Sequence, residues 1–318
     1  MCCVSESERK KGKKSNKQNQ QLITPPPPMS SLLCLLLALI HYHRSSGFLL
    51  MALPPLGRRQ HKQAASIMSA SSQDDADAKM EGTYTSLVDR LISRYERQSA
   101  ANELQNHQLF VGIAGGPGSG KSTLAQKVAE RINQRMKAVV LPMDGFHYSR
   151  AELQAIAAST DNDYTYESLI ARRGAPWTFD AEECIDKFTE ARVNGKASLP
   201  IYSRVKSDPV VDGVSLTEET KIVLLEGNYL LSWRDTRWKP LQTNKVFDET
   251  WFISCKSRSD QRGRLVKRHL ETWSEEKTKM WGQGEEGAGA KADANDMLNL
   301  VWIEEMSTGF ADLTIESI

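Results

Sequence analysis

The sequence of 318 residues predicts an α/β fold built on a doubly wound parallel sheet. Two observations lead to this prediction. Short apolar segments typical of buried strands alternate with segments whose apolar residues recur at helical spacing. In addition, the strand expected at 109–113, the helix at 124–132 and the strand at 138–141 follow one another directly. Such a strand–helix–strand unit implies that its two strands run parallel.

A glycine-rich turn joins the first strand to its helix and contains G-x-x-x-x-G-K-S, from Gly115 to Ser122. Glycines let consecutive backbone N–H groups turn toward phosphate oxygens. Lys121 supplies a point charge for the outer phosphates, and the Ser122 hydroxyl can bind Mg²⁺. The helix that follows presents its positive N-terminus to the same phosphates. A surface turn without a ligand is the alternative, but the lysine, the hydroxyl and both flanking elements favour a fold of the P-loop NTPase type.

The other elements follow in chain order. A helix is expected from Thr83, because Leu87, Leu91 and Tyr95 form one apolar stripe. Asp180 and Gly195 are placed to cap the two ends of a later helix. Helical spacing predicts further helices at 152–158, 166–172, 181–193, 257–273 and 298–306. Buried strands are expected at 221–225, 250–253 and 311–317.

Two segments do not fit the alternation of strands and helices. Residues 199–205 and 210–216 flank a turn and are expected to pair as a hairpin, a small insertion suited to binding a substrate. Residues 281–291 are rich in glycine, which predicts a mobile segment.

The charge is distributed unevenly along the chain. Residues 1–72 contain ten Lys and Arg and two Glu, whereas the remainder contains 31 basic and 38 acidic residues. The folded part is therefore mildly acidic and lacks the broad basic face that nucleic-acid binding requires. Only Cys184 and Cys255 lie beyond the first third, far apart, which argues against a disulfide framework or a zinc site and favours a reducing compartment.

The first 80 residues are expected to form a targeting or disordered extension, and residues 81–318 a P-loop domain with a helical lid. The apolar run at 32–40 is too short to span a bilayer stably but has the length of a signal-peptide core. Residues 58–72 are basic, rich in Ser and Ala and free of acids, as in a transit peptide. We expect targeting to a plastid or mitochondrion; an unstructured extension on a cytoplasmic protein is the alternative.

Three predicted strands carry reactive groups at their carboxyl ends, where doubly wound sheets bind ligands. The phosphate loop follows the first strand, Asp144 follows the second, and Glu226 follows the strand at 221–225. Either carboxylate alone is explained as a turn or surface residue. Together they describe a site that phosphorylates a hydroxyl group, with one carboxylate taking the proton and another ordering the metal. We expect Asp144 one strand away from the phosphate loop, with Gly145 allowing the acceptor to approach closely.

The sequence resembles the uridine kinase, phosphoribulokinase and pantothenate kinase family of P-loop kinases. The matching stretches are GGPGSGKST, PMDGFHYSR, RRGAPWTFD, LPIYSR, VLLEGNYLL, RGRLVKRHL and NDMLN, spread over residues 115–299. A His-Pro element of true uridine kinases is replaced by Gly174–Trp177, so nucleosides, sugars and pantothenate-like compounds all remain open as acceptors. The resemblance implies ATP and Mg²⁺ as cofactors, a small-molecule hydroxyl substrate, and a homodimer as one option for assembly.

The resemblance also implies roles for individual residues. The expected catalytic residues are Asp144, Lys121 and Arg264. ATP is expected at Gly115, Gly116, Pro117, Gly118, Ser119, Gly120, Lys121, Ser122 and Thr123, and at Arg262 and Arg268 of a basic lid helix. The metal is expected at Ser122, Glu226 and Asp144. The acceptor pocket is expected to involve His147, Tyr148, Arg173, Trp177, Tyr202, Arg204 and Asn228, although plain core packing also explains the aromatic residues.

Two other functional classes are alternatives. A GTPase is disfavoured, because Asn244-Lys245 is followed by Asp248 one residue too late for the guanine-binding N-K-x-D motif. A regulatory protein that binds ATP without transferring phosphate is the second alternative. The presence of Lys121, Asp144 and Glu226 argues against it.

Overall fold

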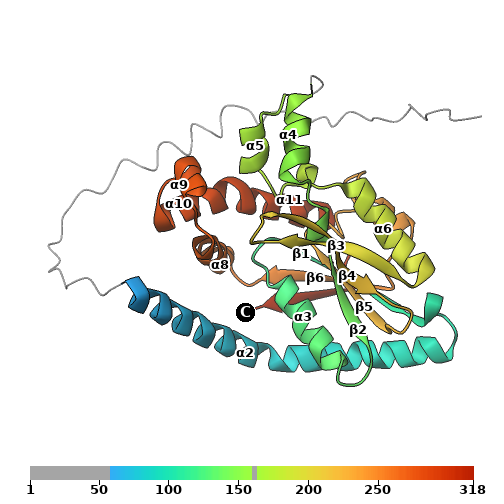
Figure 1. The fold of residues 1–318 in the computed structure, drawn as a ribbon. Coiled ribbons are helices and arrows are strands. Elements are labelled where there is room, and N and C mark those ends of the chain that lie inside the picture. Colours follow the sequence, from blue (N-terminus) through green and yellow to red (C-terminus); the bar gives the residue numbers. More distant parts are fainter. Residues whose placement is uncertain (1–57, 160–162) are drawn as a thin grey trace, which may run out of the picture. The chain divides into compact units, whose positions relative to one another are not determined.

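The computed structural model describes residues 58–159 and 163–318, with side chains from residue 78 onward. Its centre is a five-stranded sheet in the order β2-β5-β1-β6-β7, in which every neighbouring pair is parallel (Figure 1). The strands are β1 (Leu109–Gly115), β2 (Ala138–Pro142), β5 (Ile222–Gly227), β6 (Glu249–Cys255) and β7 (Leu313–Ser317). The predicted doubly wound α/β sheet is confirmed.

Helices cover both faces of this sheet, because the side chains of each strand alternate between the faces. Leu109, Val111 and Ile113 pack beneath α2 (Arg58–Ala100) and α3 (Lys121–Ile132). Phe110 points to the opposite face and belongs to a core shared with α6 (Ala181–Asn194) and α11 (Met297–Ser307). The β1 strand is therefore buried from both sides, as expected for the centre of a parallel sheet.

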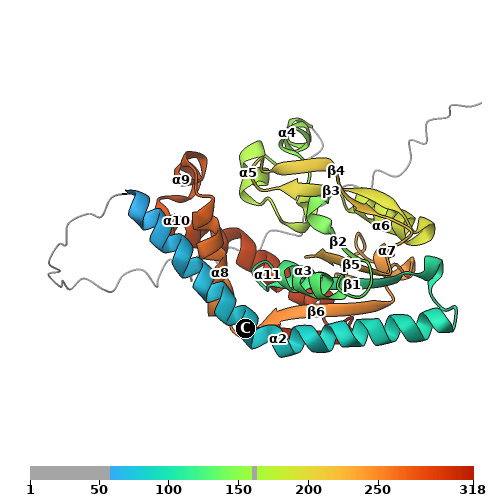
Figure 2. The ribbon, with the colours of Figure 1, turned by 60° about the horizontal axis from the view of Figure 1, so that its bottom comes forward.

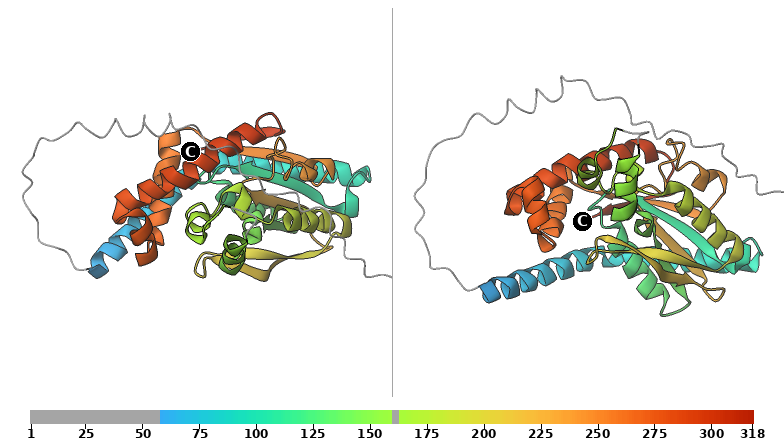
Figure 3. Two further views of the ribbon diagram at one scale, coloured as in Figure 1. Left: turned by 90° about the horizontal axis from the view of Figure 1, so that it is seen from above. Right: turned by 45° about the horizontal axis from the view of Figure 1, so that its top comes forward.

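Two groups of elements extend from the carboxyl side of the sheet. The first contains the predicted hairpin, now β3 (Ala197–Ser203) and antiparallel β4 (Asp208–Leu216), and the helices α4 (Arg150–Ala158) and α5 (Tyr166–Ala171). The second is a helical lid, in which α10 contacts both α8 and α9 (Figure 3). The lid comprises α8 (Arg258–Glu271), α9 (Glu275–Trp281), α10 (Gly284–Lys291) and a π-helical turn at Ala292–Asp296. A short helix, α7 (Pro240–Thr243), leads to β6.

The ends of α6 form as the sequence predicts. The Asp180 carboxylate accepts a hydrogen bond from the backbone N–H of Glu183 at 2.8 Å, which caps the first turn. Gly195 follows the last residue with φ of 67°, a left-handed conformation that glycine adopts without strain.

Most of the segment 281–291 is helical, whereas its glycines predicted a mobile segment: Trp281 ends α9 and residues 284–291 form α10. In α10, a Cβ added to Gly289 would lie 2.8 Å from an Arg262 nitrogen on α8. A Cβ added to Gly287 would lie 2.4 Å from the Gly282 carbonyl oxygen. These glycines allow close packing within the lid, which outweighs their low intrinsic helix propensity.

The N-terminal helix is longer than predicted. α2 begins at Arg58, well before Thr83, and its second half runs along β6 (Figure 2). Met80 and Tyr84 are buried in the core that α2 shares with α3. The extension and targeting role were predicted for residues 1–80; residues 1–57 lie outside the described residues, whereas 58–80, including the basic stretch 58–72, form the first part of α2. In the described part of the chain, no helix has the length and apolarity needed to cross a bilayer.

A buried carboxylate fastens α2 to the sheet. Glu249, at the start of β6, is fully buried and accepts hydrogen bonds from Arg90 at 2.6 Å, Arg94 at 2.5 Å and the indole of Trp251 at 2.6 Å. Burial alone would raise the pKa of the Glu249 carboxyl, but these three donors outweigh it and lower the pKa. The folded state therefore stabilises the ionised form of the Glu249 carboxyl group.

We predict that Glu249→Gln destabilises the protein by about 2 kcal/mol at pH 7, because two arginines lose their buried counter-charge. The folded-state pKa lies below the unfolded one, so this stabilisation is complete above the unfolded pKa and is lost as the pH falls through the folded pKa. Urea denaturation at several pH values measures both effects. Glu81→Gln, which removes an exposed partner of Arg131, is the control and should change stability by less than about 1 kcal/mol. Equal losses in the two variants would contradict the prediction.

Candidate active site

The glycine-rich loop connects the carboxyl end of β1 to α3 and is shaped by close backbone contacts. Gly118 and Gly120 have φ of 77° and 87°, which favour glycine over other residues. A Cβ on Gly115 would lie 2.6 Å from the Ile253 carbonyl oxygen, and one on Gly116 only 2.2 Å from a Leu300 methyl group. The backbone neighbour of Gly115 and the left-handed φ of Gly118 and Gly120 therefore require glycine, whereas a side chain at 116 would displace Leu300.

The side chains that end the loop lie beside the neighbouring strand. Lys121 is buried, with 9% of its surface exposed, and the Ser122 hydroxyl donates to a Glu226 carboxylate oxygen at 3.0 Å. This contact follows from the register, since Ala114 of β1 pairs with Gly227 of β5. Burial lowers the pKa of Lys121, and the Glu226 and Asp144 carboxylates oppose that shift.

The donor set at this point fits Mg²⁺. A serine hydroxyl and a carboxylate are oxygen ligands of the kind Mg²⁺ prefers, and the ion usually takes its remaining ligands from water and phosphate. Residues 78–159 and 163–318 contain no group of three or more His, Cys, Asp or Glu side chains suited to holding a metal. A magnesium ion held by Ser122 and Glu226 would therefore depend on a bound nucleotide for much of its coordination.

Asp144 lies in a turn directly after β2, and its position differs from the prediction. β5 lies between β2 and β1, so Asp144 is two strands from the phosphate loop rather than one. Pro142 pairs with Glu226 in the β2–β5 register, which places both carboxylates at the same edge. A Cβ on Gly145 would lie 2.0 Å from the Pro200 carbonyl oxygen. This glycine therefore admits the β3–β4 hairpin, not the acceptor as predicted.

A cavity of about 300 Å³ connects the loop, the hairpin and the lid. Its lining includes Lys121, Ser122 and Asp144 from the sheet edge and Arg268 from α8. Of the residues predicted to bind the acceptor, five line this cavity: His147, Arg173, Tyr202, Arg204 and Asn228.

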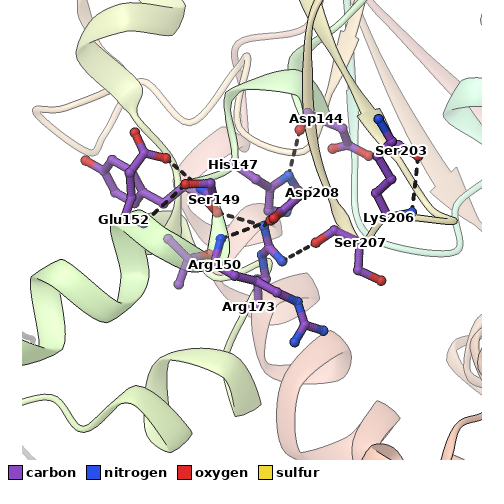
Figure 4. Close-up of polar contacts among 12 residues, drawn as sticks. Asp144, His147, Ser149, Arg150, Glu152, Arg173, Ser203, Lys206, Ser207 and Asp208 are labelled. Carbon is purple, nitrogen blue, oxygen red and sulfur yellow. Dashed lines mark hydrogen bonds and ion pairs between the residues drawn. The ribbon is translucent and has the colours of Figure 1, made fainter.

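The wall beside Asp144 is ordered by hydrogen bonds (Figure 4) and by ring contacts. His147 Nδ1 donates to the Asp144 backbone carbonyl at 2.8 Å, and its ring packs against Tyr202 with centroids 4.9 Å apart. Burial lowers the pKa of His147, which keeps the imidazole neutral near pH 7 and leaves Nε2 as an acceptor. Arg173 donates to the Tyr148 carbonyl at 2.7 Å and to Asp208 at 2.8 Å.

Other predicted site residues do not line the cavity. Tyr148 contributes its backbone, and burial, with nearby Asp180, raises the pKa of its hydroxyl to about 12. Trp177 lies under Arg172, whose guanidinium is 5.4 Å from the indole centroid. Thr123 is exposed on α3.

The two remaining lid arginines also lie outside the cavity. Arg262 forms an ion pair with Asp293 at 2.6 Å and packs against α10, away from the phosphate loop. Arg264 donates to Ser317 at 3.2 Å and reaches the Gly118 carbonyl at 3.5 Å, so it contacts the loop from behind. Arg268 is therefore the only one of the three predicted lid arginines that lines the cavity.

The lid contributes residues that the sequence reasoning missed. Gln261 donates to the Pro117 carbonyl at 2.7 Å and fixes α8 to the phosphate loop. His269 and Asp296 form a buried contact of 2.8 Å, and Asp296 lies 3.6 Å from Arg268. Asn295 donates to the Arg173 carbonyl at 2.9 Å. The stretch NDMLN was the available signal, since it carries two of these side chains.

The Phosphoribulokinase / Uridine kinase family matches residues 110–248. A protein of Schizosaccharomyces pombe named "Putative uridine kinase C227.14" is 35% identical over 226 residues, which cover 67% of this chain and 87% of that protein. The structure of a "putative fructose transport system kinase" from Silicibacter sp. TM1040 is 29% identical, with a TM-score of 0.54, and covers 65% of this chain and 89% of that one. YFH7 from Saccharomyces cerevisiae, 18% identical with a TM-score of 0.59, covers 74% and 99% of the two chains and shares the fold.

We predict that Lys121→Ala weakens MgATP binding by about 10- to 100-fold, because a charged hydrogen bond to the outer phosphates is lost. The fold should persist, because the substitution also removes the free-energy cost of burying an ammonium group. Titration calorimetry measures the affinity and thermal unfolding checks the fold. Lys196→Ala, which removes an exposed lysine, is the control and should bind normally. An unchanged affinity for Lys121→Ala would contradict a phosphate-binding role.

Proposed function

Because the chain belongs to the phosphoribulokinase/uridine kinase family, we propose that it transfers the γ-phosphate of ATP to a hydroxyl group of a small metabolite. The observation that carries the proposal is the convergence of Lys121, Ser122 and Asp144 on one cavity, in which His147 and Tyr202 form the wall beside Asp144. A phosphate-binding loop alone would serve any nucleotide-binding protein. A carboxylate that lines the same cavity, next to a wall that can hold a second substrate, is the additional feature that transfer requires.

In this proposal each residue has a distinct task. The loop amides, Lys121 and Arg268 hold the phosphates and stabilise the charge of the transferred group. Ser122 and Glu226 hold Mg²⁺, which supplies charge neutralisation at the phosphates when bound. Asp144 accepts the proton of the acceptor hydroxyl. The hydroxyl oxygen bonds to the γ-phosphorus as the bond between that phosphorus and the ADP oxygen breaks.

Asp144 is favoured over Glu226 as the base for a geometric reason. Glu226 is buried, accepts the Ser122 hydrogen bond and does not line the cavity. Asp144 is half-buried and lines it. A base must reach the hydroxyl that it deprotonates.

The class of acceptor remains uridine kinase-like in the broad sense, with sugar and pantothenate-type compounds as alternatives. A nucleotide-binding regulatory protein without transfer activity is the competing proposal. ATP consumption across nucleosides, sugars and vitamin precursors, with mass detection of products, separates them. A transferase consumes ATP only when an acceptor is present, and a regulatory protein forms no phosphorylated product with any of them.

We predict that Asp144→Asn lowers kcat by about 10²–10⁴-fold, the usual contribution of a general base, while ATP affinity changes little. Partial rescue by raised Mg²⁺ would show that Asp144 also orders the metal through water. Steady-state kinetics at saturating acceptor measure the effect. Asp212→Asn, an exposed carboxylate on the β4 strand, is the control and should retain full activity. A wild-type kcat in Asp144→Asn would contradict the assignment of Asp144 as the base and would make Glu226 the next candidate to test.

A further inference from the structure

The cavity is lined by more positive than negative side chains. Seven lysines and arginines line it, against four aspartates and glutamates. Lys121 and Arg268 lie at the phosphate loop and lid, where the proposed ATP phosphates would use their charge. The ATP phosphates do not explain the remaining positive side chains. Those beside Asp144 lie where the acceptor would bind.

Arg173 is the most buried of the arginines beside Asp144. Its side chain is only 10% exposed and its charge is balanced by Asp208 at 2.8 Å (Figure 4). The same Asp208 oxygen also accepts the backbone N–H of Arg150 at 2.9 Å. Arg173 Nε is buried and has no acceptor among the described residues. Asp208 is thus already engaged twice, and Arg173 retains one unused donor.

Arg204 lies in the turn that follows β3, and it lines the same wall. Its guanidinium forms no ion pair or hydrogen bond with any residue that the structure describes. It lies within electrostatic reach of the phosphate loop. Burial is the main cause that lowers the pKa of Lys121, and Arg204 adds to that shift. Arg204 is exposed, so its unpaired guanidinium is solvated and is available to an anionic ligand.

The base of the hairpin that carries Arg204 is held against the turn that carries Asp144. The contact at Gly145 leaves no room for a Cβ between that turn and Pro200 of β3. His147 and Tyr202, whose rings are in contact, join the same two segments. The spacing between Asp144 and the start of the Arg204 turn is therefore fixed by backbone packing.

Arg150 is a second available cation on this wall. Its guanidinium pairs with Glu276 of α9 at 3.3 and 3.5 Å, and the two side chains are 37% and 57% exposed. Such a solvent-exposed pair contributes little, about 0–1 kcal/mol. An anionic ligand with better geometry can therefore compete for Arg150.

We propose that the acceptor carries an anionic group, a carboxylate or a phosphate, which Arg204 binds with help from Arg150 while its hydroxyl faces Asp144. This inference rests on the proposed kinase function. It favours hydroxy acids and sugar phosphates over neutral nucleosides and free sugars. Guanidinium groups can form bidentate hydrogen bonds with both anions, so Arg204 and Arg150 are compatible with a carboxylate and with a phosphate.

The test measures binding and transfer separately in the full-length protein with MgADP or MgATP. Glycerate and pantothenate probe the carboxylate, ribose 5-phosphate probes the phosphate, and ribose and uridine are the neutral counterparts. The compounds are compared in the wild type, Arg204→Gln and Lys206→Gln. Lys206 is the matched control, since it is exposed in the same turn and does not line the cavity. Calorimetry gives affinities, and mass spectrometry detects phosphorylated products.

We expect an anionic compound to bind, the neutral ones to bind at least about 10-fold more weakly, and Arg204→Gln to weaken the anion by about 10- to 100-fold. Lys206→Gln should bind like the wild type. Binding of ribose or uridine as tightly as any anion, binding of no anion, or an equal loss in both variants would overturn the inference. An anion that binds through Arg204 without forming a product would contradict the kinase function and leave the anion site in place.

Discussion

The parallel register of β2, β5 and β1 is the constraint on which the site depends. It aligns three strand ends at one edge, where Ala114 pairs with Gly227 and Pro142 pairs with Glu226. Parallel strands all end on the same side of the sheet, so the strand pairing itself brings the phosphate loop, Glu226 and Asp144 to one edge. The helices on both faces bury these strands and keep the register fixed.

Close backbone packing turns that edge into an enclosed site. Gly116 lets Leu300 of α11 approach the phosphate loop, and Gly145 lets the hairpin approach the Asp144 turn. Gln261 then ties the lid to the loop through the Pro117 carbonyl. The glycines in these motifs therefore have two roles: some permit the conformation that binds phosphate, and others allow neighbouring elements to come within contact distance.

Sequence reasoning predicted the sheet, the phosphate loop and the part of the cavity wall beside Asp144, since strand ends and local motifs determine them. It placed Asp144 one strand too near the loop, because strand order depends on how the chain crosses the sheet and leaves no local signal. It predicted a mobile segment from the glycines of 281–291, whereas Gly289 allows α10 to pack closely against Arg262 of α8. It could not tell that Arg262 pairs with Asp293 while Arg268 faces the cavity, because that choice depends on how the lid helices are rotated.

The proposed function requires that a phosphoryl group passes directly to a hydroxyl group at this edge. The most direct measurement follows ATP labelled with heavy oxygen in its γ-phosphate, in the presence of candidate acceptors, by mass spectrometry of all products. Direct transfer predicts that the labelled phosphoryl group appears on the acceptor, in an amount equal to the ADP formed. Release of the label only as inorganic phosphate, whatever acceptor is present, would contradict it.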